Sequence, residues 1–426
     1  MTSTKRIAVV GGGAAGMLAA GTALAMGASV TVFEHRDRTL LKLGITGKGR
    51  CNLTNNAQIP ELIANVVHNP RFLYTAFSSF SAEDTMALFE RLGVPLKTER
   101  GRRVFPVSDK ASDIVRALRG YAAGAEIRFE HVKGIRTENG RVTGVVGREF
   151  FPADAVILAT GGCSYPMTGS DGSGFALART AGHTVTPLSP SLVPLTSPSP
   201  LCAEMQGLSL KNVALRIVRR DGGKCLYEDF GEMMFTHFGL TGPMILSASA
   251  HLEGETISLL DAVIDLKPAL DEATLDARLL GDFAKNANRN FENALGGLLP
   301  AKMIDPMLSY VGIEKTKKVN LITREERRAL LHALKEFRLP LSGFRPIEEA
   351  VVTSGGVSVK EVSPKTMMSK LCDGLFFAGE MLDVDAYTGG YNLQIAFSTG
   401  YLAGLAAADY INTLYEGDTN DLQDRS

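Results

Sequence analysis

The sequence predicts an α/β fold in which a Rossmann-type domain is interrupted by a β-rich module and then by a small helical module. Residues 1–190 and 345–426 alternate strand-like and helix-like apolar runs, which is typical of a doubly wound sheet. Residues 191–270 follow a strand pattern, and residues 271–344 show helical spacing. The chain has 426 residues, too many for one domain of about 150 residues. We therefore expect a discontinuous first domain, 1–190 with 345–426, and two inserts.

The first domain opens with a glycine-rich turn between a strand and a helix. Gly11–Gly16 reads Gly-Gly-Gly-Ala-Ala-Gly, directly after the apolar run Ile7–Val10 and at the start of a helix-forming stretch, Ala14–Met26. A second apolar run, Ser29–Glu34, ends in a carboxylate. This is the dinucleotide-binding fingerprint, in which the glycines allow a tight turn and close approach of a pyrophosphate to a helix N-terminus. The uncharged run could instead resemble a secretory signal or a membrane span, but its glycines and its strand–helix–strand pattern argue against both.

The remainder of the first domain reads as short helices and strands. Helical spacing is found at Ala82–Leu92 and Ser112–Ala123. Three short strands of a meander are expected at Glu126–Glu130, Gly134–Thr137 and Val142–Val146, with a hairpin turn at Glu138–Gly140. An apolar strand at Ala155–Ala159 ends in Thr160-Gly161-Gly162.

The Pro- and Ser-rich stretch Ser189–Pro200 marks the crossing into the inserts, because it suits neither a helix nor a central strand. Strands are expected at Leu208–Val218, Lys224–Tyr227 and Thr256–Leu260, and helices between Asp271 and Arg338. The last of these helices opens with a capping box, Thr323–Glu326. After Ala350 the α/β pattern returns, with a strand at Leu375–Ala378 and a final helix from Leu393 to Tyr410.

Composition excludes several classes of function. The net charge of −1 and the pI of about 6.7 give no electrostatic reason to expect nucleic acid or an anionic membrane as a partner. The basic stretch Lys315–Arg338 contains interspersed glutamates and is interpreted as a solvated helical face. The five cysteines are scattered and lack C-x-x-C spacing, so we expect no disulfide framework, no metal site and a reducing, cytoplasmic setting.

Three further segments favour a flavin over a plain nicotinamide cofactor. Leu43–Asn52 is rich in Gly, Thr and Asn and could follow a ribityl chain, with Arg50 against a phosphate or the flavin N1/O2 edge; an ordinary flexible loop is the alternative. Leu158–Gly162 ends a buried strand where ligands bind in such sheets. Phe376–Gln394 is a second strand–loop–helix, and its helix N-terminus near Asn392 would favour an anionic reduced flavin.

In combination these motifs resemble the BaiN-like, aminoacetone-oxidase-like family of FAD-dependent oxidoreductases, a branch of the two-dinucleotide-binding-domain flavoproteins. The matching segments are Gly11–Gly16, Thr46–Asn55, Arg103–Ala111, Ala159–Gly162 with Ser164–Pro166, Phe235–Pro243, Val352–Val357 and Gly379–Asn392. The resemblance implies a non-covalent FAD in a domain interrupted by a β-barrel-like and a helical module. Members look like reductases of steroid-like or bile-acid-like enones, or like oxidases of small amino ketones. The family pattern usually has Gly where Lys48 stands and Asp-Gly where Asp385-Ala386 stand.

The predicted FAD site gathers residues from all of these segments. Its expected members are Gly11, Gly13, Ala14, Ala15, Gly16, Glu34, His35, Thr46, Gly47, Gly49, Arg50, Cys51, Asn52, Val132, Ala159, Thr160, Gly161, Gly379, Glu380, Asp383, Gly390, Tyr391, Asn392 and Leu393. Glu34 is expected on the ribose of the AMP half, and Glu380 and Asp383 on the ribityl hydroxyls. Cys51 has no nearby partner for a redox disulfide.

Flavin chemistry needs few side chains, but reduction of a C=C bond needs a proton donor. The candidates are His237, Tyr165, Tyr387 and Tyr391, each of which could equally be a packing residue. We expect an FAD-dependent reductase that takes electrons from NADH or NADPH and reduces a small organic acceptor such as a conjugated enone. The alternatives are a flavin oxidase of a small amino ketone or amine that forms H₂O₂, and a flavin-bound sensor or RNA-modification partner. The oligomeric state is left open.

Overall fold

The computed structural model describes residues 5–423, and the chain divides into two compact units. The first unit combines residues up to Ser191 with those from Ile347 onward, and the second is Leu192–Pro346. Each unit has its own hydrophobic core. The division of the inserted unit at residues 270 and 271 stays a prediction, because its strands and helices contribute to a single core.

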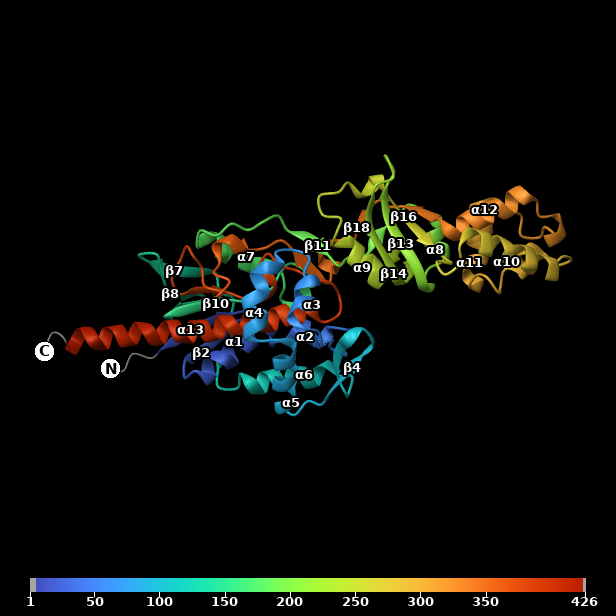
Figure 1. Ribbon diagram of the computed structural model, residues 1–426. Helices are drawn as coiled ribbons and strands as arrows, with labels where there is room; N and C mark the ends of the chain where they lie inside the picture. The colour runs from blue at the N-terminus through green and yellow to red at the C-terminus, as the bar shows by residue number, and fades with distance from the viewer. Residues whose placement is uncertain (1–4, 424–426) are drawn as a thin grey trace. The chain divides into compact units, whose positions relative to one another are not determined.

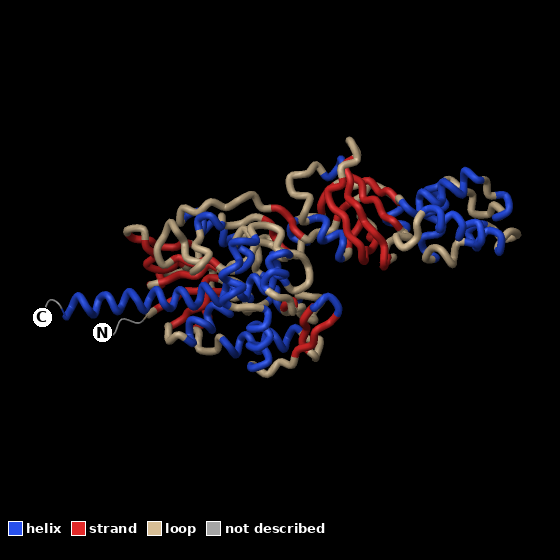
Figure 2. The backbone as a smooth tube through the Cα atoms, viewed as in Figure 1, coloured by secondary structure: helices blue, strands red, loops and turns tan. Residues whose placement is uncertain are grey.

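The first unit is built on a five-stranded parallel sheet (Figures 1 and 2). Its strands are, in order, β20 (Leu375–Phe377), β10 (Ala155–Leu158), β1 (Arg6–Val10), β2 (Ser29–Glu34) and β6 (Glu126–Phe129). The central strands are buried along almost their whole length, which explains their continuous apolar runs. The predicted Rossmann core is therefore confirmed.

Two helices pack closely beside this sheet. α1 (Ala14–Ala25) connects β1 to β2, and α13 (Tyr391–Gln423), red in Figure 1, runs alongside it. A Cβ atom on Gly400 would lie 2.4 Å from the carbonyl oxygen of Ala15, and one on Gly404 would lie 2.4 Å from that of Ala19. Only glycine at these positions permits the observed helix–helix approach. α13 starts two residues before the predicted Leu393 and continues beyond the predicted Tyr410.

The meander predicted after residue 126 is correct only in part. β6 pairs in parallel with β2 and so belongs to the main sheet, which corrects the expectation that it opens the meander. The meander consists of β7 (Gly134–Glu138), β8 (Arg141–Val146) and β9 (Phe150–Pro152). The segment between β6 and β7 carries Val132 to the pocket described below.

Shorter elements complete the first unit. The helices are α2 (Leu41–Ile45), α3 (Ile59–Ala64), α4 (Tyr74–Ser79), α5 (Ala82–Arg91), α6 (Ala111–Tyr121) and α7 (Ser173–Thr180). β3 (Thr54–Asn55), β5 (Arg103–Pro106) and β4 (Leu96–Glu99) form an antiparallel sheet, and β11 (Ser189–Ser191) pairs with β19 (Val352–Ser354). The predicted helices near residues 82 and 112 are confirmed.

The second unit contains a seven-stranded antiparallel sheet. Its order is β17 (Phe337–Pro340), β16 (Leu260–Asp265), β13 (Ser209–Arg219), β14 (Cys225–Thr236), β15 (Gly239–Thr241), β12 (Leu195–Thr196) and β18 (Gly343–Phe344). The strand expected at Thr256–Leu260 is wrong, because residues 257–259 form a 3₁₀ turn and β16 begins at Leu260. Ile257 is buried but Leu259 is half exposed, so the apolar residues of this segment do not share one buried face.

The second unit has five α-helices among the described residues. They are α8 (Pro200–Glu204), α9 (Pro243–Ser249), α10 (Glu272–Lys285), α11 (Ala301–Val311) and α12 (Arg324–Lys335). Three lie in the predicted helical stretch Asp271–Arg338, whereas α8 and α9 interrupt the stretch that was expected to be β-rich. The capping box of α12 is present, since the Thr323 hydroxyl accepts from the Glu326 N–H and the Glu326 carboxylate accepts from the Thr323 N–H.

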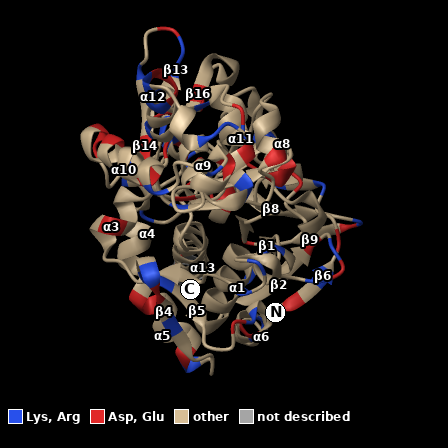
Figure 3. Ribbon diagram, turned by 90° about the vertical axis from the view of Figure 1, so that its right-hand side faces the viewer, with Lys and Arg blue, Asp and Glu red and all other residues tan. Residues whose placement is uncertain are grey.

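Basic and acidic segments alternate along the ribbon of both units (Figure 3). Among the helices that the structure describes, none combines the length and apolarity needed to cross a membrane.

Candidate functional site

A pocket in the first unit lies where the parallel strands β1, β2, β10 and β20 end. Its wall combines the β1–α1 turn, the end of β2, α2 and segments after β6, β10 and β20. It contains fifteen of the predicted site residues: Gly11, Gly13, Ala14, Ala15, Glu34, His35, Thr46, Val132, Ala159, Thr160, Gly161, Gly379, Glu380, Asn392 and Leu393. Residues from six distant parts of the sequence thus converge on one cavity.

The three fingerprint glycines have three different surroundings. A Cβ atom on Gly11, where φ is +108°, would lie 2.4 Å from the carbonyl oxygen of Ala159, so this turn fits only glycine. A Cβ on Gly16 would lie 1.9 Å from the carbonyl oxygen of Gly11. A Cβ on Gly13 would meet no described atom within 4 Å. Gly13, the N-cap of α1, therefore leaves space in front of a helix N-terminus, where an anion binds favourably.

Glu34 is fixed at the end of β2. Its Oε2 accepts a hydrogen bond from the Gly12 N–H at 3.0 Å, and its Oε1 accepts from the Arg36 N–H at 2.9 Å. The side chain is nearly buried but lines the pocket. Each oxygen retains a second lone pair, so a carboxylate in this position can still accept from sugar hydroxyls.

Two histidines and a serine lie near Glu34 on the pocket wall. The rings of His35 and His131 are 5.7 Å apart, and Nε2 of His35 lies 3.5 Å from a carboxylate oxygen of Asp171. Ser170 also lines the pocket, and its buried Oγ has no hydrogen-bond partner among the described residues. His131 and Ser170 were not predicted as site residues. No sequence motif marks Ser170.

A charged pair occupies another part of the wall. Nζ of Lys42 lies 2.6 Å from Oε2 of Glu380 and donates to Oγ of Ser164 at 2.6 Å. Oε1 of Glu380 accepts from Ser164 at 3.0 Å and from the Thr353 N–H at 3.0 Å. Glu380 was predicted, but Lys42 was missed, although a lone lysine just before the Gly- and Thr-rich loop offered a signal.

The start of α13 also reaches the pocket. The first N–H groups of a helix have no partner within it, so they favour an electron-rich group. Asn392 lines the pocket and holds the preceding loop, because its Oδ1 accepts from the Ala386 N–H at 2.9 Å and its Nδ2 donates to the Ala386 carbonyl at 2.6 Å.

The glycine-rich loop after α2 contributes Thr46 to the pocket wall, whereas Gly47 and Gly49 do not line it. Gly47, Lys48 and Gly49 all have positive φ, at 61°, 57° and 80°. Lys48 therefore occupies a conformation that favours glycine.

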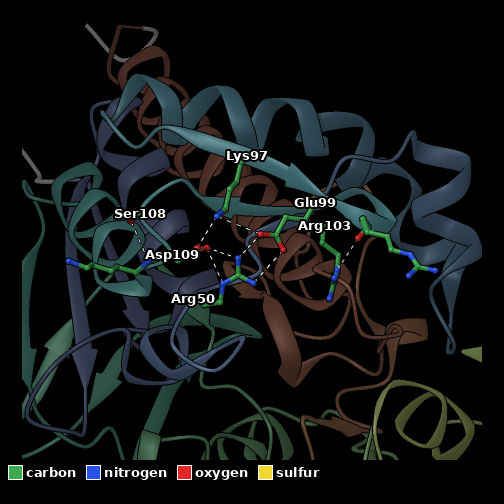
Figure 4. A network of polar contacts seen from close by, with 8 residues as sticks. Arg50, Lys97, Glu99, Arg103, Ser108 and Asp109 are labelled. Carbon is green, nitrogen blue, oxygen red and sulfur yellow. Dashed lines mark hydrogen bonds and ion pairs between the residues drawn. The ribbon is translucent and has the colours of Figure 1, made fainter. Parts of the chain in front are cut away.

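Arg50 lies outside the pocket lining, in an ion-pair network with the β4–β5 region (Figure 4). Its guanidinium donates to Glu99 at 2.5 Å and to Asp109 at 2.5 Å, and Nζ of Lys97 donates to Asp109 at 2.8 Å. The hydrogen bond with Arg50 lowers the pKa of Glu99, and that with Lys97 lowers the pKa of Asp109. The predicted contact of Arg50 with a phosphate or the flavin edge stays a prediction; the network fastens the loop to its neighbours.

Cys51 and Asn52 are the last two residues of the same loop. Cys51 is fully buried, and burial raises the pKa of its thiol to about 12. A buried thiol with a raised pKa forms little thiolate near neutral pH. The Oδ1 of Asn52 is buried and has no hydrogen-bond partner in the described part of the chain.

Several predicted residues do not line the pocket. Gly16 lies beneath the turn, while Asp383, Gly390 and Tyr391 belong to the loop before α13 and its first residue. A Cβ on Gly390 would collide with the backbone of Thr54 at 2.4 Å, so its role is close packing.

The proton-donor candidates are not brought together. Tyr165 and Tyr387 belong to the first unit but do not line the pocket. Burial raises the pKa of Tyr391, whose side chain is also influenced by Glu61 and Arg102. His237 lies in the second unit, in the turn between β14 and β15, with its ring against Phe238.

The residues present fit an adenine dinucleotide. The space at Gly13, the carboxylate of Glu34 and the unpartnered hydroxyl of Ser170 supply a phosphate cradle and polar groups for a sugar. No cluster of His, Cys, Asp and Glu able to hold a metal ion is found among residues 5–423.

Comparison with known proteins agrees with this geometry. A family model described as "HI0933-like protein Rossmann domain" matches residues 5–406. The 3-dehydro-bile acid delta(4,6)-reductase of Clostridium scindens is 34% identical over 421 residues, covering 95% of this chain and 99% of that protein. The ribosomal RNA dihydrouridine synthase of Escherichia coli is 30% identical over 399 residues, covering 92% of this chain and 95% of that protein.

Solved structures share the fold at low identity. A 3-ketosteroid-delta4-(5alpha)-dehydrogenase from Rhodococcus jostii has a TM-score of 0.51 at 15% identity, covering 96% of this chain and 98% of that chain. A flavocytochrome c3 fumarate reductase in an open conformation also has a TM-score of 0.51, at 17% identity, covering 96% and 79%. These two likenesses show the fold alone.

Proposed function

This chain belongs to the HI0933-like family of FAD-dependent oxidoreductases, and from that premise we propose that it reduces a carbon–carbon double bond conjugated to a carbonyl group. The substrate we propose is a small polycyclic enone of the steroid or bile-acid type. The single observation that carries this proposal is the 34% identity, over nearly the full length of both chains, to a 3-dehydro-bile acid delta(4,6)-reductase.

The names of the two relatives support a common reaction class. A 3-oxo group next to a Δ4 double bond is a conjugated enone, and the C5=C6 bond of uracil is conjugated to the C4 carbonyl. Both bonds are electron-poor at the carbon remote from the carbonyl, which is where a hydride adds. A relative that acts on each kind of bond therefore favours reduction over oxidation of an amino ketone or amine.

The residues of the pocket would each bind a different part of the cofactor in such an enzyme. When bound, FAD supplies the two-electron chemistry. Gly13 and the start of α1 would hold its pyrophosphate, and Glu34 its AMP ribose. Lys42 and Glu380 would bind the middle of the cofactor through the ribityl hydroxyls. Buried apolar side chains such as Val10, Phe33 and Leu40 also line the pocket, and they would shield part of a bound cofactor from water.

We further propose NADH or NADPH as the electron donor, acting by transient contact with the flavin. The sequence has one glycine fingerprint of this kind, Gly11–Gly16, so it offers no second dedicated dinucleotide site. We also propose the reducing, cytoplasmic setting that the sequence suggests, because the five cysteines are scattered and lack C-x-x-C spacing.

A second candidate function is reduction of a uracil ring in RNA, and the relative from Escherichia coli favours it. The overall charge of −1 and the alternating charges of both units argue for the small substrate instead.

One experiment separates these functions. The purified protein, reconstituted with FAD, is reduced anaerobically with NADH or NADPH and then mixed with a Δ4-3-oxosteroid, with an RNA fragment of ribosomal sequence, or with air. Fast reoxidation by the steroid, with a saturated ketone as product, supports the proposal. Reoxidation by the RNA alone supports the second candidate, and fast reoxidation only by air, with H₂O₂, supports an oxidase.

A further inference from the structure

Gln394 is a fully buried residue in the first turn of α13, the helix whose start reaches the pocket. Its Oε1 accepts from the hydroxyl groups of Thr54 at 2.6 Å and Thr85 at 2.9 Å. Its Nε2 donates to the carbonyl oxygen of Phe80 at 3.1 Å and to Oγ of Ser398 at 2.9 Å. Thr54 belongs to β3, Thr85 to α5, and Phe80 is the C-cap of α4. The amide group therefore fastens α13 to three other elements and has no hydrogen bond left for a ligand.

The loop that leads into α13 is held against β3 as well. Nδ2 of Asn55 donates to the carbonyl oxygen of Gly389 at 3.1 Å. A Cβ atom on Gly390 would lie 2.4 Å from the carbonyl oxygen of Thr54, so the two backbones are in close contact. The start of α13 is thus fixed to β3 through the backbone before the helix and through a side chain in its first turn.

The residues on either side of Gln394 face the pocket. Its lining includes Asn392, Leu393, Ile395 and Ala396. Successive residues of an α-helix are about 100° apart around its axis, so these four positions surround the face opposite Gln394. One face of this turn therefore borders the pocket, and the hydrogen bonds of Gln394 fix the other face to the core.

We infer that Gln394 is a positioning residue that holds the first turn of α13 against the flavin half of bound FAD; this inference rests on the FAD binding in the proposed function. Gly13 and Glu34 are assigned to the pyrophosphate and the AMP ribose, so the flavin half has the rest of the lining, which includes α13. The free N–H groups of a helix start stabilise a negatively charged reduced flavin more than the neutral oxidised form. By fixing this turn, Gln394 raises the midpoint potential of the cofactor.

A purely structural role for Gln394 has different consequences. A residue that only stabilises the core changes the free energy of unfolding and leaves the midpoint potential of the bound cofactor unchanged. A positioning residue changes the potential, because the distance between the helix start and the flavin changes. The midpoint potential therefore separates the two roles, and it requires neither a substrate nor turnover.

The test compares the FAD-loaded variants Gln394→Leu and Thr54→Val with the wild type, by anaerobic reduction in the presence of a reference dye. Gln394→Leu removes all four hydrogen bonds of the amide group, whereas Thr54→Val removes one hydroxyl group with little change of shape. In Gln394→Leu we expect the affinity for reduced FAD, relative to that for oxidised FAD, to fall about tenfold. This lowers the midpoint potential by about 30 mV for a two-electron couple. Thr54→Val should shift it less, in the same direction.

Two further variants are matched controls. Thr54→Ser keeps the hydroxyl group and loses only a methyl group, so it should retain the wild-type potential. Leu402→Ala truncates a buried side chain further along α13 and outside the pocket lining. It should lower the free energy of unfolding, as a cavity in the core does, without changing the potential.

The outcomes are distinct. Wild-type potentials in Gln394→Leu and Thr54→Val overturn the role of Gln394. Equal shifts in Thr54→Val and Thr54→Ser, or a shift as large in Leu402→Ala, attribute the potential to core packing and overturn it as well. A protein that holds no FAD overturns the proposed function and this inference together. The expected shifts in an enzyme that reduces no enone overturn the proposed substrate alone.

Discussion

Lys42 and Glu380 form an ion pair within the pocket wall, with 2.6 Å between Nζ and Oε2. The two residues are 338 positions apart in the sequence, and Ser164 donates to Glu380 and accepts from Lys42. In this position the Glu380 carboxylate can accept hydrogen bonds from hydroxyl groups, and the Lys42 ammonium group can bind an electron-rich group.

Replacement of Lys42 by Met should weaken FAD binding. The substitution leaves the Glu380 carboxylate without its cation, so the pocket becomes more negative toward an anionic cofactor. We expect the Kd for FAD, measured by titration of the FAD-free protein, to rise about tenfold or more, which is about 1.4 kcal/mol. Lys48→Met, in the loop nearby, serves as the matched control. Equal affinities for the two variants would argue against a cofactor contact by Lys42.

Gly13 and Gly16 should respond differently to alanine. Gly13→Ala places its methyl group where no described atom lies within 4 Å, at a backbone φ of −80° that alanine adopts. Its unfolding free energy without FAD should stay within about 1 kcal/mol of wild type, while the methyl group occupies the space of the pyrophosphate and FAD binding is lost.

Gly16→Ala should instead destabilise the fold, because its methyl group would lie 1.9 Å from the Gly11 carbonyl oxygen. A cost of about 3 kcal/mol or more is expected from such overpacking. Denaturant titrations of both variants, with and without FAD, check the pair. Unchanged FAD affinity in Gly13→Ala would place the pyrophosphate elsewhere.

The elements that could be predicted are those whose signal is local. The apolar run of β1, the glycines at 11–16 and the apolar run of β2 are contiguous, and the structure confirms all three as strand, turn and strand. β6 could not be assigned to its sheet, because its partner β2 lies about 95 residues earlier, whereas its neighbours in sequence form a meander.

The site shows the same division. Glu34 could be predicted as a site residue from its place at the end of β2. Lys42 could not, because its partners Ser164 and Glu380 come close to it only through tertiary folding. The contact of Arg50 with a phosphate or with the flavin N1/O2 edge stays a prediction, while its acidic partners Glu99 and Asp109, from the β4–β5 region, were not foreseen. Positive charge in a loop does not reveal which acids the fold places beside it.

The thiols should differ in reactivity. Cys51 is fully buried, and burial raises the pKa of its thiol to about 12, whereas Cys225 is exposed. In the native protein at pH 8, a disulfide reagent such as DTNB should label Cys225 quickly and leave Cys51 unmodified until the chain unfolds. Cys225→Ser should remove the fast phase. A fast phase that persists in this variant and disappears in Cys51→Ser would contradict the burial of Cys51.

Stability should fall in mild acid because of His183. Its side chain is fully buried, Nε2 lies 2.7 Å from Oγ of Ser369, and burial lowers its pKa below 6.5 despite Glu361 at 3.4 Å. The folded state therefore disfavours the proton, while the unfolded state binds it below pH 6.5. The stabilisation is fully present above that pH and decreases as the pH falls toward the folded-state pKa. Glu361 also has a lowered pKa, so it stays ionised in this range.

Urea unfolding at pH 7.5 and pH 5.5 measures this effect. The wild type should lose stability between the two values. His183→Gln should be less stable at pH 7.5, by about 1 kcal/mol for the altered hydrogen bonds, but should show a smaller change between the two pH values. His332→Gln, which replaces an exposed histidine, should keep the wild-type slope. If His183→Gln retains the full wild-type loss between pH 7.5 and 5.5, other groups cause the acid sensitivity and the burial of a neutral His183 does not control it.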